Sequence, residues 1–371
     1  MQFDVYFDFG PTLESIWRYF EKSCDHTVFQ CYDWLANWQF TVGKNQLMVD
    51  PVVIVVRDQQ IPVALFPFGL RRTMGIKVLE FLGGKQTDYN APMVNPVFSS
   101  VHLLKAIWPE VEKKLPPHDA RSFVRIPAKL SHRENLWPMV IGARYVSLAF
   151  SASLPQTIPE WEQRISASRR ADSRRQLKKL SAKGQLRFST VECNDMHHVT
   201  VAAMIAQKRE RYRETGVRDI LSKKETQEFY KNLSGKLGEA GRIHVSSASV
   251  DGKILATHWG AIYGDRYYWL MPSYAGGEWK RFSAGRLLLE HNIRWAIENN
   301  MKVFDFTIGG EEYKKHWCDN QMTIYDRLDY YSTVGMFYVY AQRFLKWVKS
   351  NSRTRKIITL LIASSRSSFR N

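Results

Sequence analysis

Residues 301–317 bring five ionisable side chains close together, directly after a short apolar strand pattern. The cluster consists of Asp305, Glu311, Tyr313, Lys314 and His316, and Gly309 and Gly310 lie at the end of the strand. Open α/β sheets bind ligands near the carboxyl ends of strands, so this position suits a catalytic site. Lys314 or Tyr313 could supply a cation or a proton to a developing negative charge, with Asp305 or Glu311 orienting it. Acyl transfer requires this chemistry, although a Tyr-Lys pair on a short helix, taken alone, is more often structural.

A second set of charged residues lies where a long predicted strand ends and a helix begins. The set consists of Lys280, Arg281 and Arg286, with Ser283, Ala284 and Gly285 between them. The helix dipole disfavours cations at this end by about 0.3–1 kcal/mol each. A bound phosphate would reverse that sign, because free backbone N–H groups and cations would converge on one anion. We therefore predict a pyrophosphate-binding turn; ordinary helix capping by Ser283 is the alternative.

Two further segments could take part in chemistry. His258 lies on a predicted central strand, and an imidazole with a pKa near neutrality can act as a general base; a satisfied core histidine is the alternative. Asp88 and Tyr89 lie in a glycine-rich loop after a predicted strand. We expect this loop, together with Glu311, to contact an acceptor substrate, unless the loop serves only as a connection.

The charge of the chain is unevenly distributed. Of the formal net charge of +17 over 371 residues, residues 1–150 carry +2 and residues 151–371 carry +15. Such asymmetry predicts an anionic partner for the second half, namely a nucleotide-like cofactor, a nucleic acid or a membrane surface, although a merely soluble basic surface is also compatible. A predicted helix at 160–183 concentrates eight of these cations and can be either an anion-recognition helix or a solvated face.

The predicted elements alternate between strands and helices and indicate a mixed α/β fold. A chain of this length suits two domains, and the Ser/Pro-rich segment 151–159 predicts a boundary between residues 1–150 and 151–332. A basic tail follows at 333–371. We predict a strand at 5–9 with a helix from Pro11, helices at 101–114, 196–214, 223–238 and 284–299, and strands at 242–250, 253–263, 266–273, 302–308 and 323–331. The Asp-Gly and Gly-Asp pairs at 251–252 and 264–265 predict hairpin turns.

The tail and the termini bear on location. The four cysteines fit no disulfide framework, the start lacks the features of a signal peptide, and no apolar run approaches the length of about 18 residues that spans a bilayer. We therefore expect a cytoplasmic protein. No acidic residue follows Asp329, and an apolar stripe in the tail is accompanied by basic residues. Such a helix can lie on anionic lipid at the inner face of the membrane or pack on the domain. The stripe consists of Phe337, Tyr340, Ala341, Phe344 and Val348, and the basic residues are Arg343, Lys346 and Lys349.

Several of these segments together resemble a known family. The strings at 243–259, 283–289 and 305–317 resemble the CelD/BcsL-type acetyltransferases of the GNAT superfamily, which are related to the Fem-type aminoacyltransferases of peptidoglycan synthesis. Phe66-Pro67, Phe81-Leu82-Gly83 and Asp88-Tyr89 fit the same pattern, so the resemblance covers about residues 45–330. It implies tandem GNAT-like domains, an acetyl-CoA or other acyl-CoA donor with its pyrophosphate on residues 283–286, a functional Lys314 and no metal. The usual GNAT phosphate signature is not met, because Ser283 stands where its first glycine belongs.

The resemblance implies an N- or O-acetyltransferase that acts on a sugar or amino compound of envelope or exopolysaccharide biosynthesis. Direct attack of the acceptor on the thioester is expected. An aminoacyl-tRNA-dependent transferase is the alternative among enzymes, and the basic helix at 160–183 favours it because an RNA-borne donor needs an extended basic track. A non-catalytic protein that binds membrane or nucleic acid through a degenerate GNAT fold is the alternative outside enzymes.

Overall fold

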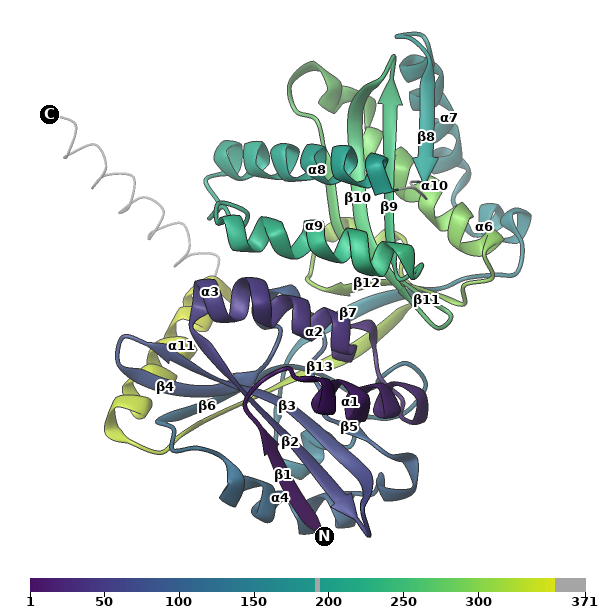
Figure 1. Cartoon of the computed structure of the whole chain (residues 1–371). Coiled ribbons are helices and arrows are strands. Elements are labelled where there is room, and N and C mark those ends of the chain that lie inside the picture. The colour runs from purple at the N-terminus through teal and green to yellow at the C-terminus, as the bar shows by residue number, and fades with distance from the viewer. Residues whose placement is uncertain (191–193, 351–371) are drawn as a thin grey trace, which may run out of the picture.

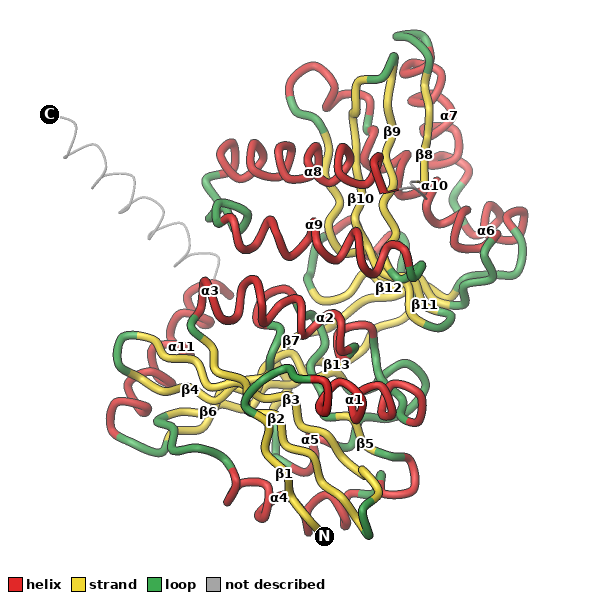
Figure 2. Tube along the Cα trace, viewed as in Figure 1, coloured by secondary structure: helices red, strands yellow, loops and turns green. Residues whose placement is uncertain are grey.

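The computed structural model describes residues 1–190 and 194–350 of the chain. Its strands form one mixed sheet with the order β1-β2-β3-β4-β6-β13-β7-β12-β11-β10-β9-β8, and β5 pairs with β3 (Figures 1 and 2). The strands are β1 (Gln2–Tyr6), β2 (Val49–Asp58), β3 (Ile61–Thr73), β4 (Ile76–Phe81), β5 (Met93–Val94), β6 (Ala120–Pro127), β7 (Arg144–Ser153), β8 (Leu186–Thr190), β9 (Ile243–Val250), β10 (Lys253–Tyr263), β11 (Arg266–Tyr274), β12 (Val303–Ile308) and β13 (Asn320–Tyr330). The predicted mixed α/β fold is confirmed.

Helices cover both faces of the sheet (Figure 1). They are α1 (Pro11–Ser23), α2 (Tyr32–Trp38), α3 (Lys44–Leu47), α4 (Val101–Lys114), α5 (Trp137–Val140), α6 (Ile158–Arg164), α7 (Ala167–Ser181), α8 (Asn194–Thr215), α9 (Lys224–Glu239), α10 (Ala284–Glu298) and α11 (Thr333–Ser350), with short 3-10 helices η5 (Gly277–Phe282) and η6 (Glu312–His316) among the connections. α8 and α9 pack on one face of β9–β11, and α10 packs on the other.

The strands β9, β10 and β11 form a meander because their turns have the required residues. Asp251 and Gly252 adopt φ angles of +47° and +78°, and Gly264 adopts +57°. Asn, Asp and Gly tolerate this left-handed region, which tight hairpin turns need. Both predicted hairpin turns are therefore confirmed, and the strands that they join agree with the predicted ranges to within a residue.

The two halves of the chain share strands and a core. β13 lies between β6 and β7, and β7 in turn pairs with β12, so late strands are inserted among early ones. Trp34 of α2 lies 5.5 Å from the ring of Phe229 in α9 and 5.8 Å from that of Trp259 in β10. The predicted division at residues 150 and 151 stays a prediction; β7 spans it.

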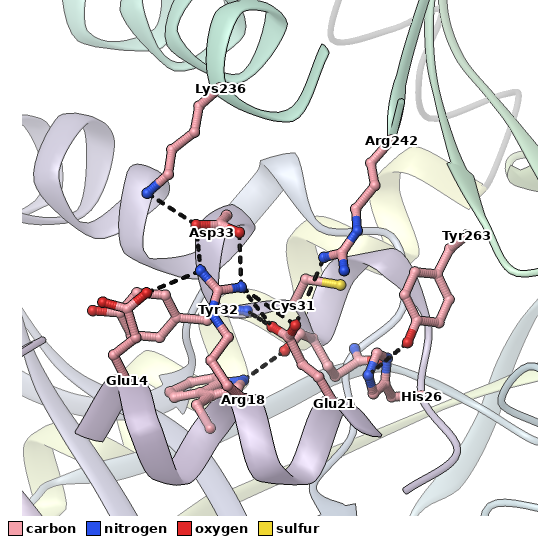
Figure 3. A network of polar contacts seen from close by, with 12 residues as sticks. Glu14, Arg18, Glu21, His26, Cys31, Tyr32, Asp33, Lys236, Arg242 and Tyr263 are labelled. Carbon is pink, nitrogen blue, oxygen red and sulfur yellow. Dashed lines mark hydrogen bonds and ion pairs between the residues drawn. The ribbon is translucent and has the colours of Figure 1, made fainter. Parts of the chain in front are cut away.

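A polar network also joins the halves beside this core (Figure 3). Asp33 of α2 binds the Arg18 guanidinium at 2.7 Å and the Lys236 ammonium of α9 at 3.0 Å. The Tyr263 hydroxyl of β10 lies 2.9 Å from Nε2 of His26, which is buried. The Asp33–Lys236 ion pair and the Tyr263–His26 hydrogen bond each join one half to the other, and the Arg18–Asp33 ion pair holds Asp33 in place. The network therefore fixes how α1 and α2 meet α9 and β10.

Two predicted elements differ from the structure. The helix predicted at 160–183 is two helices, α6 and α7, because Ile165 is extended and the Ser166 hydroxyl accepts a hydrogen bond from the Arg169 N–H to begin a new helix. The first strand lies at β1 rather than at 5–9, where Asp8 to Gly10 instead lead into α1. Both errors concern boundaries that local hydrogen bonds and strand pairing decide.

Candidate active site

The sheet opens between β11 and β12. These parallel strands pair only through Arg266 with Val303, Tyr267 with Phe304 and Tyr268 with Asp305. Beyond these residues β11 stays with β10, β12 stays with β7, and no pairing joins β11 to β12 within the described residues. Among the described residues the backbone edge of β11 towards Tyr274 therefore has no strand partner on this side.

The predicted phosphate-binding turn follows β11 directly. Lys280 and Arg281 are exposed, and α10 begins after Ser283, which has a left-handed φ of +55° and makes no capping hydrogen bond with its side chain. The Arg286 and Leu287 N–H groups donate to the Ser283 carbonyl oxygen at 3.0 and 3.1 Å, so within the described residues only the Ala284 and Gly285 N–H groups of the first turn are left without a backbone partner. The alternative prediction, that the Ser283 side chain caps the helix, is therefore wrong. The turn, with Ala284 and Gly285 at its start, stays a predicted pyrophosphate-binding site.

Arg286 has a different environment from the other two cations. Its guanidinium binds Asp172 of α7 at 2.5 Å and lowers the pKa of that carboxyl below its usual range, as does Arg175 to a lesser extent. Arg286 therefore holds α7 against α10. Of the predicted cations, Lys280 and Arg281 are the ones left to meet an anion.

The segment after β12 is folded around Lys314. The Lys314 ammonium is buried, donates to the Ile308 carbonyl oxygen at 2.9 Å and pairs with Glu311 at 2.9 Å. Gly309 makes this possible: its φ is +119°, and a Cβ atom there would lie 2.5 Å from Glu311 Oε2. An ammonium group has three N–H donors, and two of them have partners among the described residues.

Tyr313 packs on β12 while part of its side chain stays exposed to solvent. Its ring is 6.2 Å from that of Phe306, and burial raises the pKa of its phenol, so the hydroxyl keeps its proton at neutral pH. Phe306 belongs to the part of β12 that has left β11. Tyr313 therefore lies beside the opening in the sheet as a neutral proton donor.

Asp305 forms an anchor between the two halves with the first-half loop. Its carboxylate accepts hydrogen bonds from the Tyr89 hydroxyl at 2.9 Å, from Arg266 at 2.9 Å and from the Thr307 N–H at 2.7 Å. Asp88 in turn accepts from the Thr307 hydroxyl at 2.8 Å. The structure thus brings together Asp88, Tyr89 and Asp305, but Tyr89 and Asp305 are buried and occupied by one another.

His258 lies apart from these groups, in the core. It is 0% exposed, its ring stacks on Trp269 at 3.8 Å, and Nδ1 is 3.0 Å from the Tyr267 hydroxyl. Burial lowers its pKa well below the usual value, so the ring is neutral. A neutral imidazole could accept a proton, but a sealed ring cannot reach a substrate in this conformation.

The basic helix α7 connects the two sides of the site. Arg169 donates to the His316 carbonyl oxygen at 3.0 Å, while Asp172 one turn later binds Arg286. The helix leaves a row of cations exposed, namely Arg174, Arg175, Lys178 and Lys179. α7 therefore links η6 to the start of α10 and adds positive charge beside the phosphate-binding turn.

Lys208 of α8 is a candidate that the sequence did not indicate. The neighbouring Gln207 side chain bonds to the Ile254 carbonyl oxygen and the Ser273 hydroxyl, which fixes this part of α8 over β10 and β11. Burial lowers the pKa of Lys208 to about 8, and the negative charge of Glu311 opposes that change. No hydrogen bond or ion pair is formed by its ammonium group with the residues that the structure describes. Glu311 thus has lysines from two elements near it.

The comparisons agree with this architecture. Residues 167–315 match a family model described as an acetyltransferase (GNAT) domain. The structure is similar to the crystal structure of FemX, with 10% identity, a TM-score of 0.59 and coverage of 87% of this chain and 97% of that chain. It is also similar to a tandem GNAT protein from the clavulanic acid biosynthesis pathway, with 10% identity, a TM-score of 0.50 and coverage of 89% and 98%. L-PGS from Bacillus licheniformis gives 10% identity, a TM-score of 0.51 and coverage of 90% and 95%.

Together these findings define the class of protein. The fold is that of tandem GNAT proteins, and residues 167–315 match the model of a GNAT acetyltransferase domain, which supports an acyltransferase. A search of curated proteins found no match. The narrower resemblance to CelD/BcsL-type enzymes stays a prediction.

Proposed function

We propose that the protein transfers an acyl group from acyl-CoA, acetyl-CoA in the simplest case, to a hydroxyl or amino group of a sugar or amino compound used in envelope or exopolysaccharide synthesis in the cytoplasm. The observation that carries the proposal is the opening between β11 and β12 beside an uncapped helix start with two exposed cations. In this proposal residues 151–332 hold the donor and residues 1–150 contribute the acceptor side.

The residues present divide the work of the reaction. Lys280, Arg281 and the N–H groups of Ala284 and Gly285 would hold the donor pyrophosphate, and the unpaired edge of β11 would bind the extended arm of the donor. The acceptor oxygen or nitrogen attacks the thioester carbon, the C–S bond breaks, and the thiolate leaves with a proton. Donors fixed in a site shielded from water stabilise the developing oxyanion more than water would.

Three side chains near the opening could carry out separate steps of this reaction. The remaining N–H of Lys314 would bind the oxyanion, and the Tyr313 phenol would protonate the leaving thiolate. Lys208, with a pKa of about 8, would accept the proton of the nucleophile. Exposed Glu311 remains the candidate acceptor contact. In this proposal Asp88, Tyr89 and Asp305 support the site by anchoring the two halves to each other. His258 takes no part in proton transfer.

An aminoacyl-tRNA donor is the second candidate, and the exposed cations of α7 favour it. A row of solvent-exposed lysines and arginines beside the phosphate-binding turn suits an extended polyanion. The same helix also suits the phosphates of CoA, so the donor must be decided by binding.

Isothermal titration of the purified chain with acetyl-CoA tests the proposal. We expect binding that weakens at least about tenfold in the double variant Lys280→Glu with Arg281→Glu, because a charge pair that attracts becomes one that repels. Lys44→Glu with Lys105→Glu changes the net charge equally at exposed positions of α3 and α4 and should bind normally. Tight binding of tRNA with no acetyl-CoA binding would favour the second candidate, and binding of neither donor would contradict both.

A further inference from the structure

Helix α11 presents a broad apolar face to solvent. Phe337 is 67% exposed, Phe344 60%, Trp347 54% and Tyr340 53%, with Val334 and Leu345 also exposed. Their spacing places all six on one side of an α-helix, since residues three, four and seven apart share a face. Large aromatic side chains concentrated in this way on one surface usually mark a site of interaction.

The opposite face of α11 is fixed to the protein, so the apolar face cannot turn inward. Gly335 approaches the backbone so closely that a Cβ atom there would lie 1.8 Å from the Asp119 carbonyl oxygen, and Val339 is 0% exposed. The Arg71 guanidinium donates to the Tyr338 hydroxyl at 3.0 Å. Among the described residues the exposed stripe therefore faces away from the part of the protein to which α11 is fixed.

The charged residues of α11 itself all have one sign, although Asp326 of β13 pairs with one of them. Arg343 is exposed, with its guanidinium 5.7 Å from the Tyr340 ring, and Lys346 pairs with Asp326 of β13. No acidic residue occurs in the sequence after Asp329, whereas eight lysines and arginines do. The segment 351–371, which carries five of them, lies outside the described residues.

We propose that α11 docks the protein on an anionic lipid bilayer, with Phe337, Tyr340, Phe344 and Trp347 at the depth of the lipid headgroups. Aromatic side chains and flanking cations are the combination that amphipathic helices use at this interface. A second copy of the chain fits less well, because a symmetric pairing would bring the same basic margin of each α11 together. No helix in the described part of the chain is long and apolar enough to cross a membrane, so the contact is with its surface. The proposal does not depend on which acyl donor the enzyme uses.

Flotation of the full chain with vesicles tests this docking. We expect binding to vesicles of phosphatidylcholine and phosphatidylglycerol in equal parts and much weaker binding to phosphatidylcholine alone. The double variant Phe337→Ser with Phe344→Ser should bind about tenfold or more weakly, and Arg343→Gln about fivefold more weakly. Phe7→Ser, at a phenylalanine that is 63% exposed outside α11, should bind like the wild type.

Light scattering of the same proteins distinguishes lipid docking from self-association through α11. Circular dichroism must show that the double variant is folded, which the exposure of both phenylalanines predicts. A wild-type dimer that becomes a monomer in the double variant, without vesicle binding, would show that α11 pairs two copies and would overturn the proposal. Equal binding of the double variant and the wild type, or equal binding to both kinds of vesicle, would also overturn it.

Discussion

Lys314 and Lys315 are adjacent in the sequence, but the fold gives them different environments. Lys314 is buried with Glu311 and the Ile308 carbonyl oxygen, whereas Lys315 pairs with Glu312 at the surface. We predict that Lys314→Met lowers kcat by about 10²–10³, because a donor to the oxyanion is lost. Lys315→Met should retain kcat. Thiol release from acetyl-CoA measures the rate once an acceptor is found, and equal rates for both variants would contradict the role of Lys314.

Lys208 should appear in the pH dependence of the reaction. Its pKa of about 8 means that the neutral amine, which can accept a proton, becomes more abundant as the pH rises through 8. We therefore expect kcat/KM to rise through that pH and to level off above it. Lys208→Arg keeps the positive charge but cannot lose it, so the rise should vanish and the rate should stay low. A profile that is identical in the variant would exclude Lys208 as the base.

Sequence reasoning indicated candidate residues where their possible chemistry follows from local context. The cluster that contains Tyr313 and Lys314 is recognisable because a strand, two glycines and charged residues follow one another. Lys208 is not, since it stands among other charged residues in the run Gln207-Lys208-Arg209-Glu210 and only packing over β10 and β11 distinguishes it. The hydrogen bond from Tyr89 to Asp305 spans 216 positions, so no local pattern indicates it.

The turn between β12 and η6 can be tested at Gly309. A side chain there would oppose a φ of +119° and would lie 2.5 Å from Glu311 Oε2. We predict that Gly309→Ala displaces Glu311 from Lys314, reduces kcat/KM about tenfold or more and destabilises the fold by about 1–3 kcal/mol. Gly310→Ala is the matched control, because a Cβ atom at Gly310 meets nothing within 4 Å. Similar activity and thermal stability in both variants would show that the turn tolerates change.

Elements were predictable where short-range signals define them and not where distant strands do. The hairpin turns of β9–β11 and the extent of α4 follow from turn residues and from apolar spacing within a few residues. The insertion of β13 between β6 and β7 joins segments about 200 positions apart and depends on the whole sheet. The separation of β11 from β12 is a further consequence of that sheet, so the sequence could place the turn at 283–286 but could not show where the two strands stop pairing.

The whole molecule should lose stability in mild acid, because its fold buries neutral histidines. Burial, with the nearby Arg242 charge, lowers the pKa of His26 to about 3, and burial lowers that of His244 to about 3. In the unfolded chain a histidine has a pKa near 6.5, so between these values the unfolded state binds the proton and folding stability falls as the pH falls. Each such histidine should reduce the free energy of unfolding by about 2 kcal/mol between pH 7.5 and 5.

His26 allows this effect to be assigned to the network between the halves (Figure 3). Its Nδ1 faces the Thr27 carbonyl oxygen, which only accepts, so Nδ1 carries the proton and Nε2 accepts from the Tyr263 hydroxyl. Protonation of Nε2 would place a buried positive charge beside Arg242, and the Tyr263 hydroxyl would have to accept instead of donate. In urea unfolding followed by circular dichroism, His26→Gln should be less stable at pH 7.5 but lose about 2 kcal/mol less on acidification to pH 5 than the wild type. The control His132→Gln, in an exposed loop, should lose as much free energy of unfolding on acidification as the wild type. If His26→Gln also lost as much as the wild type, the acid sensitivity would arise elsewhere than in the contact between α1–α2 and β10.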